Sequence, residues 1–276
     1  MDRQQIIKND VSRALAEDIG DGDVSAELID ADSVLETRLL IREDAVLCGT
    51  EWFDEAFRQC APDIQINWLA SDGDCISADT VICEVSGPAR ALLTAERSAL
   101  NFLQTLSGTA TMTRHYADLI KHTQCRILDT RKTIPLLRRA QKYAVRCGGG
   151  LNHRIGLFDA YLIKENHLAA CGSIAEAVDR ARRSHPDLLL EVEVESIDQL
   201  KAAIDAGADR ALLDNFTIEE TRQAVALNDK RIQLEASGNI TEQSLIEIAR
   251  TGVDFVSIGA LTKHLRAIDY SLRFIS

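Results

Sequence analysis

The sequence predicts an α/β protein whose larger part is a parallel barrel, and two regularities support this fold class. From about residue 125 onward, short apolar segments alternate with helical patterns. Each apolar segment is followed, at its carboxyl end, by a charged, hydroxyl-bearing or glycine residue. Alternating strands and helices form parallel sheets with right-handed crossovers. In a barrel the carboxyl ends of the strands converge on one mouth, where barrel enzymes place their catalytic groups.

The alternation defines six expected strands, at residues 125–128, 160–163, 188–194, 211–213, 232–234 and 255–258. Helical patterns lie between them, at 135–147, 173–184, 196–206, 217–227 and 241–250. Four of these helices have a serine or threonine in the N-cap position, namely Ser173, Ser196, Thr217 and Thr241. Gly207 and Gly252 are expected to end two helices. An open doubly wound sheet would concentrate polar residues at one switch point, so polar residues after all six strands favour a barrel.

The first part of the chain has a different pattern. It predicts a small α+β unit with antiparallel strands at 39–41, 64–68 and 81–85 and helices at 2–18 and 52–60. Thr94 is expected to cap the next helix, and Gly108 to end it. Arg97 lies near the apolar face of that helix, where a simple reading is an aliphatic stem along the core with its charged head in water.

Composition limits the class of protein. The formal net charge is -12, which argues against a nucleic-acid binder, because phosphate contacts need a basic face. No apolar run reaches the roughly 18 residues that a membrane helix needs, and the first ten residues lack the apolar region of a signal peptide. The seven cysteines are scattered without a Cys-x-x-Cys pair, as expected for reduced thiols. We therefore expect a cytoplasmic protein that binds neither nucleic acid nor membrane.

Five basic side chains gather after the first two expected strands: Arg131, Lys132, His153, Arg154 and Lys164. Such a cluster in an acidic protein predicts a pocket for a small, multiply anionic ligand. Arginine forks bind carboxylates in two-pronged fashion, and lysines supply point charges for phosphate or carboxylate. Two simpler readings stay open: each cation taken singly is a surface charge, and His153 is a buried structural histidine. His167 is expected to support the start of a helix.

Glu193 and Asp214 follow the next two strands and would form an acidic side of the mouth. The alternation Glu191-Val-Glu-Val-Glu195 places three carboxylates on one strand face. Their burial is costly unless cations pair with them or ligand hydroxyls donate hydrogen bonds to them. Glu193 and Asp214 could hold ribose hydroxyls or Mg²⁺, which prefers oxygen ligands and substrate phosphates. The alternative is an internal ion-pair network with Lys164 and the arginines.

Small residues follow the last two strands, in Ser237-Gly-Asn239 and Gly259-Ala260. They would leave backbone N–H groups open to a phosphate. Gly148-Gly-Gly150 follows a helix rather than a strand, so it is not a dinucleotide fingerprint, and we expect a flexible loop covering the mouth. A cationic wall, an acidic wall and a phosphate cradle together suit a phosphorylated sugar meeting a small polycarboxylate.

Motifs spread over the whole chain resemble the quinolinate phosphoribosyltransferase family, also called carboxylating nicotinate-nucleotide pyrophosphorylases. They are Glu17–Asp23, Leu93–Phe102, Thr130–Thr133, Gly148–Arg154, Leu162–His167, Glu191–Glu195, Leu212–Asn215 and Ser257–Ala260. The resemblance implies an N-terminal α/β sandwich domain, residues 1–108 joined by the tail 267–276, and an incomplete six-stranded α/β barrel, residues 109–266. One departure is Leu136, at a position where the family usually has glycine.

The resemblance implies a glycosyltransferase of the pentosyl class. Its reaction converts quinolinate and phosphoribosyl pyrophosphate (PRPP), with Mg²⁺, into nicotinate mononucleotide, pyrophosphate and CO₂ in NAD biosynthesis. It also implies a homodimer, or a hexamer of dimers, in which the partner subunit completes each mouth.

The resemblance also implies a role for each candidate residue. Lys164, Glu193 and Asp214 would be catalytic, and Mg²⁺ would be held mainly by substrate, with Glu193 and Asp214 as possible ligands. Quinolinate would contact Arg97 (from the partner subunit), Arg131, His153, Arg154 and Lys164. PRPP would contact Lys132, Glu193, Asp214, Ser237, Gly238, Asn239, Gly259 and Ala260.

Three rival functions remain open at this point. A paralogue of the same fold, similar to the molybdenum-utilisation proteins, would keep the phosphate cradle but not need the dicarboxylate wall. A lyase could form a Schiff base on Lys164, although the crowd of arginines disfavours it. A binding protein would keep the wall without turnover.

Overall fold

The computed structural model describes residues 2–275, which divide into two compact units. The N-terminal unit contains the residues up to 114, together with 133–149 and those from 261 on. The barrel unit contains residues 115–132 and 150–260. Met1 and Ser276, the outermost residues of the expected first domain and tail, lie outside the described residues.

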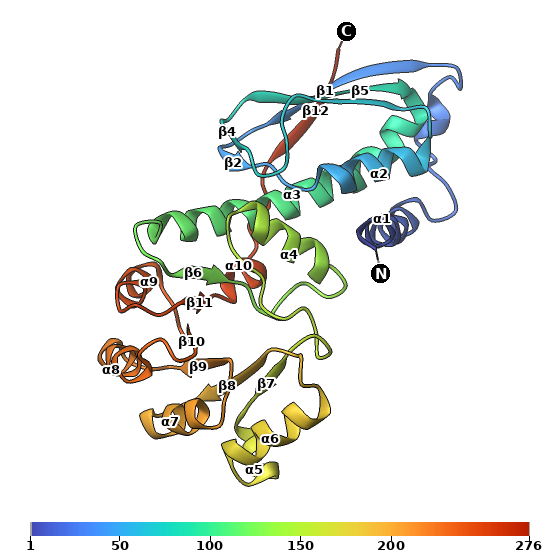
Figure 1. Cartoon of the computed structure of the whole chain (residues 1–276). Helices are drawn as coiled ribbons and strands as arrows, with labels where there is room; N and C mark the ends of the chain where they lie inside the picture. Colours follow the sequence, from blue (N-terminus) through green and yellow to red (C-terminus); the bar gives the residue numbers. More distant parts are fainter. Residues whose placement is uncertain (1, 276) are drawn as a thin grey trace. The chain divides into compact units, whose positions relative to one another are not determined.

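The N-terminal unit contains a four-stranded antiparallel sheet (Figure 1). Its order is β12 (Tyr270–Phe274), β1 (Val34–Ile41), β5 (Thr80–Pro88) and β3 (Gln65–Trp68). The last strand of the chain therefore pairs with the first, with Leu39 opposite Leu272. A second, two-stranded sheet joins β2 (Ala45–Val46) to β4 (Cys75–Ile76).

Helices supply most of the remaining core of this unit. They are α1 (Arg3–Ile19), the 3-10 turn η1 (Ala26–Leu28), α2 (Thr50–Cys60), α3 (Ala89–Leu119), α4 (Arg138–Cys147) and the short α10 (Ala260–Lys263). In α1 the buried positions are Ile7, Val11 and Leu15, which recur every four residues and so form one face. In α2, Phe53 and Phe57 are fully buried by the same spacing.

Helix α3 differs from the sequence prediction at both ends. Thr94 does not cap it but lies within it, where its hydroxyl donates to the carbonyl of Arg90 one turn earlier. Gly108 does not end it either: a Cβ built there would lie 2.3 Å from the carbonyl oxygen of Arg266. The glycine therefore allows close backbone contact instead of stopping the helix. Despite its 31 residues, α3 is too polar to cross a membrane, and no other helix within residues 2–275 could do so.

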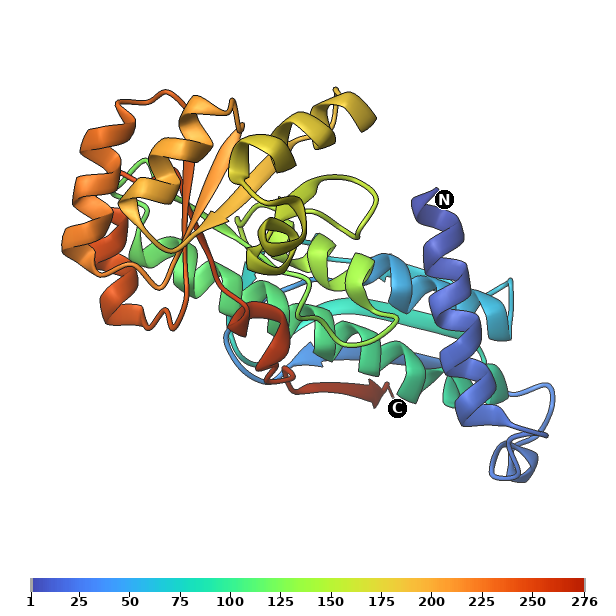
Figure 2. The ribbon, with the colours of Figure 1, turned by 90° about the horizontal axis from the view of Figure 1, so that it is seen from below.

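The barrel unit is a parallel six-stranded sheet, as predicted (Figures 1 and 2). In order, the strands are β6 (Arg126–Leu128), β11 (Phe255–Ser257), β10 (Gln233–Ser237), β9 (Arg210–Asp214), β8 (Leu190–Val194) and β7 (Tyr161–Ile163). Among the described residues β6 and β7 do not pair, so the barrel is incomplete. Its helices are α5 (Glu165–Cys171), α6 (Ile174–Ser184), α7 (Ile197–Asp205), α8 (Ile218–Asn228) and α9 (Glu242–Ala249).

The predicted helix boundaries of this unit are confirmed by hydrogen bonds. The four expected N-cap hydroxyls each accept from the backbone N–H three residues later: Ser173 from Glu176, Ser196 from Gln199, Thr217 from Glu220 and Thr241 from Ser244. Gly207 and Gly252 follow α7 and α9 with φ of 83° and 100°, a conformation that glycine adopts without steric cost.

The glycine run after α4 is packed, in contrast to the flexible loop expected from the sequence. Gly148 is buried, and a Cβ there would lie 2.4 Å from the carbonyl oxygen of Ala110 on α3. Three residues later, Leu151 forms a parallel bridge to Leu128 of β6. Glycine is needed here for close packing.

We predict that Gly108→Ala lowers the free energy of unfolding. At an exposed helix position this change stabilises by about 0.5–1 kcal/mol, but the contact with the Arg266 carbonyl predicts an overpacking cost of about 1–3 kcal/mol. Urea unfolding measures the balance. Asn101→Gly and Asn101→Ala, at an exposed position of α3, give the intrinsic difference between the two residues. A Gly108→Ala protein as stable as wild type would contradict the packing argument.

Candidate active site

The strand register places the polar residues of the barrel on one face of the sheet. Glu191 is opposite Arg210, and Arg210 is opposite Gln233. Side chains alternate between faces, so Glu193, Asp214, Glu235 and Ser237 share the face of these three residues. The neighbouring positions on the other face are apolar and buried: Val192, Val194, Ala211, Leu213, Leu234 and Ala236. The carboxyl ends of the strands therefore bring the predicted acidic and small residues together.

Below these ends lies a buried charge cluster. Glu191 and Glu235 are fully buried, and His153 Nε2 lies 2.7 Å from Glu191 Oε2 and 3.5 Å from Glu235 Oε2. Arg210 Nη1 donates to Glu235 at 3.4 Å, and its guanidinium lies over the ring of Phe255. The histidine and the two carboxylates are close enough to share a metal ion. Arg210 already supplies positive charge there, which favours an internal ionic network.

Asp129 fixes the orientation of His153. This fully buried carboxylate, just after β6, accepts from Asn152 Nδ2 at 2.6 Å and from the backbone N–H of His153 at 2.9 Å. The N–H of Arg154 in turn donates to His153 Nδ1 at 2.8 Å. Because Nδ1 is an acceptor, the ring proton of the neutral histidine lies on Nε2, facing Glu191. Both ring nitrogens of His153 therefore contact protein groups.

Burial controls the ionisation of the two carboxyls. Desolvation, and then the charge of Glu191, raise the pKa of Glu235 to about 8, although His153, the Ser257 hydroxyl and Arg210 act in the opposite direction. Desolvation also raises the pKa of Glu191, while Arg210 and a hydrogen bond with Glu235 oppose the rise. We infer that Glu235 holds a proton near neutral pH.

Arg131 and Arg154 form the cationic side of the site. Burial lowers the pKa of the Arg154 guanidinium, and the positive charge of Arg131 lowers it further. Arg154 donates to the carbonyl of Ala160, and the loop between these residues is held by Asp159, which accepts from the N–H groups of Ile155 and Gly156. Arg131, after β6, and Arg154, on the held loop, repel each other and are thus arranged for an anion.

Lys164 and Glu193 form a close ion pair at the carboxyl ends of β7 and β8. The lysine side chain is 44% exposed and the glutamate 14%, so the pair borders the open side of the site. His167 is the helix-start residue that the sequence predicted, since its Nδ1 accepts from the backbone N–H of Lys164. The pair agrees with the alternative interpretation, in which Glu193 belongs to an ion-pair network. It also places one cation and one anion at the open side of the site, where each could bind a substrate group in place of its partner.

Backbone conformation shapes the loops after β9 and β10. Asn215, next to Asp214, has φ of 56° and donates to Asp214 Oδ2 at 3.1 Å. At Gly238, φ is 104°, and a Cβ there would lie 2.1 Å from Asn215 Oδ1. Asn239 has φ of 47° and donates to Asn215 Oδ1 at 3.4 Å. Glycine is thus required in this loop, and the two asparagines connect neighbouring strand ends.

Lys132 lies against the small residues after β11. A Cβ on Gly259 would be 3.1 Å from Lys132 Cδ, so the glycine makes room for the lysine side chain. The N–H of Lys132 donates to Thr130 Oγ1 at 3.0 Å, which fixes the turn after β6. Ala260 begins α10 directly after Gly259. The lysine side chain thus packs on the backbone of Gly259, directly before α10.

Most of the predicted site residues belong to the barrel unit. Arg131, Lys132, His153, Arg154, Lys164, Glu193, Asp214, Ser237, Gly238, Asn239, Gly259 and Ala260 are all in it. Arg97 is an exposed residue of α3 in the N-terminal unit. Sequence reasoning missed the supporting roles of Asp129, Asn152, Arg210 and Glu235. Their only signal was position, a polar residue within or just after a buried strand.

Leu136, the departure from the family motif, keeps the backbone that a glycine would adopt. Its φ is 66°, and its side chain is 79% exposed. The turn is held by the buried Gln141, which accepts from the N–H of Ile134 and donates to the carbonyl of Thr262. A leucine in this conformation costs roughly 1–2 kcal/mol, so the surrounding hydrogen bonds impose the turn despite the substitution.

A separate hollow of about 1180 Å³ lies at the opposite ends of the strands. Its lining includes Cys125, Asp209, Gln233 and Asp254, which stand at or just before the starts of β6, β9, β10 and β11. In barrels that end contributes to stability, whereas chemistry is placed at the carboxyl ends. The convergent charged residues, and not the size of this hollow, therefore define the candidate site.

The fold and the charges define an α/β-barrel enzyme for small anionic substrates, and comparison with known proteins gives the family. A family described as "Quinolinate phosphoribosyl transferase" matches through its N-terminal domain at residues 23–107 and its C-terminal domain at residues 109–273. The chain belongs to the quinolinate phosphoribosyltransferase family, whose members are phosphoribosyl-transferring enzymes. The family domains meet inside α3, whereas the compact units divide at residue 114. The expected domain boundaries stay a prediction.

Individual relatives cover nearly the whole chain. "Nicotinate-nucleotide pyrophosphorylase [carboxylating]" of Mycobacterium leprae is 39% identical, over 96% of this chain and 96% of the relative. "Quinolinate phosphoribosyltransferase [decarboxylating] 1b" of Nicotiana tabacum is 35% identical, over 97% and 82%. The solved structure of the nicotinate-nucleotide pyrophosphorylase from Francisella tularensis is 49% identical, with a TM-score of 0.97, over 100% and 98%.

We predict that Glu235 makes the protein less stable as pH rises. Its pKa is raised on folding from an ordinary 4.5 to about 8, so in this window the native state holds a proton that the unfolded state lacks. The free energy of unfolding should then fall by up to about 1.4 kcal/mol per pH unit. Urea unfolding at several pH values in this window gives the free energy of unfolding as a function of pH. That free energy should fall less with pH for Glu235→Gln than for the wild type.

The matched control is Glu195→Gln, which removes an exposed carboxyl just beyond β8 and should leave the slope of the wild type unchanged. Equal slopes for wild type and Glu235→Gln would mean that Glu235 is already ionised at neutral pH.

Proposed function

We propose that this protein transfers the phosphoribosyl group of PRPP to quinolinate and releases pyrophosphate and CO₂, giving nicotinate mononucleotide for NAD biosynthesis. The family match over nearly the whole chain supports the reaction. The observation that carries the substrate assignment is the pair Arg131 and Arg154, whose charges repel, near the carboxyl ends of the barrel strands. A dicarboxylate would neutralise both guanidiniums.

In the proposed complex, Arg131, Arg154 and Lys164 bind the two carboxylates of quinolinate. Each charge-assisted hydrogen bond contributes about 1.5–3 kcal/mol. His153 was expected to bind quinolinate as well, but its ring nitrogens contact Glu191 and the N–H of Arg154. We therefore propose that His153 positions the Arg154 loop, and that direct binding to quinolinate is secondary.

The sugar phosphate would occupy the neighbouring strand ends. Glu193 and Asp214 are proposed to contact the ribose hydroxyls, and Lys132 the phosphates. Open backbone for the 5′-phosphate is provided by Ser237, Gly238, Asn239, Gly259 and Ala260. Support for this cradle comes from Lys132, whose side chain packs on Gly259, and from the positive φ of Gly238 and Asn239 in the loop after β10.

The chemistry requires charge compensation more than proton transfer. The ring nitrogen of quinolinate attacks the anomeric carbon as pyrophosphate leaves, and positive charge develops on the ribose. The carboxylates of Glu193 and Asp214 stabilise that charge electrostatically. The positive charge of the product pyridinium stabilises the electron pair left on the ring carbon when the adjacent carboxylate leaves as CO₂, and that carbon then takes a proton from water. The arginines hold the ring in place meanwhile.

Mg²⁺ is the proposed cofactor. Both candidate ligands are carboxylates. Glu193 forms an ion pair with Lys164, and Asp214 is partly exposed beside Asn215. Such a sparse set of oxygen donors fits Mg²⁺, which keeps several waters and binds through one or two carboxylates plus substrate phosphates. When bound, the ion would neutralise the pyrophosphate leaving group.

A homodimer, or a hexamer of dimers, is proposed as the working assembly, with Arg97 acting in the mouth of the partner subunit. Arg97 is exposed, and the loop after Arg154 carries two exposed apolar side chains, Leu157 at 75% and Phe158 at 67%. Exposed apolar groups beside a site suit a surface that another subunit covers. The reduced, scattered cysteines of the sequence support a cytoplasmic location.

We expect the purified protein, given quinolinate, PRPP and Mg²⁺, to release pyrophosphate and CO₂ in equal amounts. Nicotinate in place of quinolinate is the control and should release neither, because it lacks the second carboxylate that the arginines hold. Pyrophosphate release with nicotinate would contradict the dicarboxylate wall. Binding of PRPP by folded protein without any turnover would instead favour the paralogue or a binding protein.

For the shared mouth, we expect Arg97→Ala and Lys164→Ala to be inactive alone and to regain activity when mixed. In a heterodimer one mouth combines an intact barrel with an intact Arg97, so random subunit exchange should restore about a quarter of the wild-type mouths. Exchange is verified by mass, and activity by pyrophosphate release.

The matched control mixes Arg131→Ala with Lys164→Ala. Both residues belong to the same barrel, so no heterodimer has an intact mouth and no activity should return. Exchange without recovery in the first mixture would remove Arg97 from the partner's site.

A further inference from the structure

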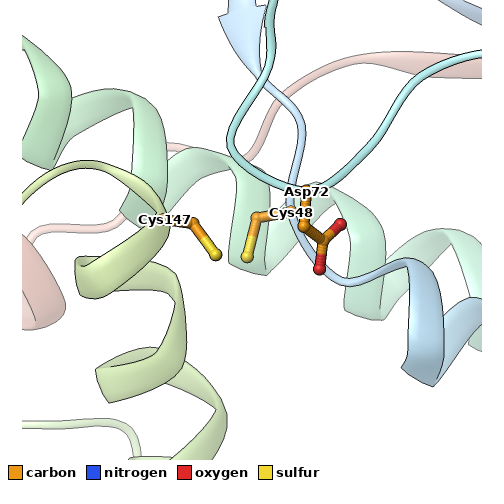
Figure 3. Close-up of side chains that lie close together, drawn as sticks. All are labelled: Cys48, Asp72 and Cys147. Carbon is orange, nitrogen blue, oxygen red and sulfur yellow. The ribbon is translucent and has the colours of Figure 1, made fainter.

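Two cysteines that are 99 residues apart in sequence meet in the N-terminal unit. Cys48 Sγ, Cys147 Sγ and a carboxylate oxygen of Asp72 all lie within 4.8 Å of one another. Figure 3 shows the two sulfur atoms side by side, with the Asp72 carboxylate beyond Cys48. Cys48 precedes α2 and is fully buried, whereas Cys147 is the last residue of α4 and is partly exposed.

The backbone holds Cys48 in place. The Ser107 hydroxyl accepts from the N–H of Cys48 at 2.9 Å and lies 3.1 Å from its carbonyl oxygen. Tyr270 donates to the same hydroxyl, which fixes its position. Cys48 therefore cannot move away from its neighbour without breaking buried hydrogen bonds.

The backbone at Cys147 is equally constrained. Its carbonyl accepts from Arg114 Nη2 at 3.4 Å, and the next residue, Gly148, packs directly on α3. The backbone thus keeps the two cysteines next to each other, and only their side chains need to turn for the sulfurs to meet.

Asp72 is an unsuitable metal ligand, although its oxygen is near both sulfurs. Its Oδ1 accepts from the N–H groups of Gly49 and Thr50, and its Oδ2 from Gly49 and from the Tyr143 hydroxyl. A carboxylate has about four lone-pair directions, and three donors, one of which is shared by both oxygens, occupy most of them. Asp72 therefore caps α2 and anchors α4, which leaves the two sulfurs as the reactive part of the cluster.

Their surroundings make Cys48 the hydrogen-bond donor and Cys147 the acceptor. A hydrogen bond from Cys48 lowers the pKa of Cys147, with Tyr143 and Arg3 acting in the same direction against burial and the charge of Asp72. Burial raises the pKa of Cys48 well above its usual range. A stabilised thiolate facing a buried thiol is the arrangement found in reactive dithiol sites.

From this geometry we propose that Cys147 and Cys48 form an oxidation site, in which Cys147 reacts first with a peroxide and Cys48 then closes a disulfide. The bond would tie the end of α4 to the start of α2. Both cysteines belong to the N-terminal unit, and the proposal does not depend on phosphoribosyl transfer.

The two steps balance. The Cys147 thiolate attacks one oxygen of hydrogen peroxide, the S–O bond forms as the O–O bond breaks, and hydroxide leaves, which gives a sulfenic acid. The Cys48 thiol then loses its proton as its sulfur attacks the Cys147 sulfur, the S–S bond forms, and the oxygen leaves as water. Both sulfurs are oxidised, and the peroxide is reduced to water.

The first test measures alkylation by iodoacetamide against pH, residue by residue, by peptide mass spectrometry. The midpoint for Cys147 should lie below that of Cys75, an exposed thiol of the same unit that serves as the internal control. Cys48→Ala should raise the Cys147 midpoint, because it removes the hydrogen bond that stabilises the thiolate. A midpoint for Cys147 at or above that of Cys75 would overturn the proposal.

The second test treats the wild type with hydrogen peroxide and maps disulfides. A Cys48–Cys147 peptide that is reversed by dithiothreitol, with the intact mass lower by two hydrogens, is expected. Cys48→Ser should stop at a sulfenic acid on Cys147, and Cys75→Ser should behave as wild type. Circular dichroism confirms that each variant is folded.

Two outcomes would refute the proposal. One is oxidation of other cysteines while Cys48 and Cys147 stay reduced in folded protein. The other is stoichiometric Zn²⁺ binding that protects both thiols from peroxide and is lost in Cys48→Ser and Cys147→Ser, which would identify a metal site instead.

Discussion

The candidate site depends on a buried charge network inside the barrel. Glu191 and Glu235 have no access to solvent, so protonation or a neighbouring cation must compensate each of them. Glu235 holds the proton, Arg210 contributes one charge, and His153 Nε2 contacts both carboxylates. If this network were apolar, β8 and β10 would pack equally well, but His153 would lose the partners that fix its ring. The free-energy cost of burying these charges is thus linked to the positioning of the loop that begins at His153.

That loop carries the cationic side of the mouth. Asp129 holds the backbone of His153, the N–H of Arg154 is held by the His153 ring, and Asp159 holds the two residues that follow. Arg154 is therefore presented near Arg131 although the two charges repel each other. An anionic substrate gains from this arrangement because the repulsion is already present before binding. In a protein with a net charge of -12, such a local concentration of cations also directs small anions to the mouth.

Local patterns predicted most of the fold. Six apolar segments became the six strands, and four N-cap hydroxyls made the expected hydrogen bonds, because both signals act over a few residues. The errors came from contacts between distant segments. Gly108 has the sequence signature of a helix end, but its actual role is to admit the carbonyl of Arg266, 158 residues later. Likewise, nothing local to His153 reveals that its ring contacts Glu191 and Glu235.

The segment from Cys147 to Arg154 shows why glycine was needed where a flexible loop was expected. At its start, the carbonyl of Cys147 is bound by Arg114, and Gly148 lies too close to α3 for any side chain. At its end, Leu151 pairs with β6 and Asp129 holds the next two residues. A segment fixed at both ends within so few residues has little freedom to relax. Glycine at 148 thus serves close backbone packing, and the contacts of Asp129 then hold the residues that directly precede Arg154.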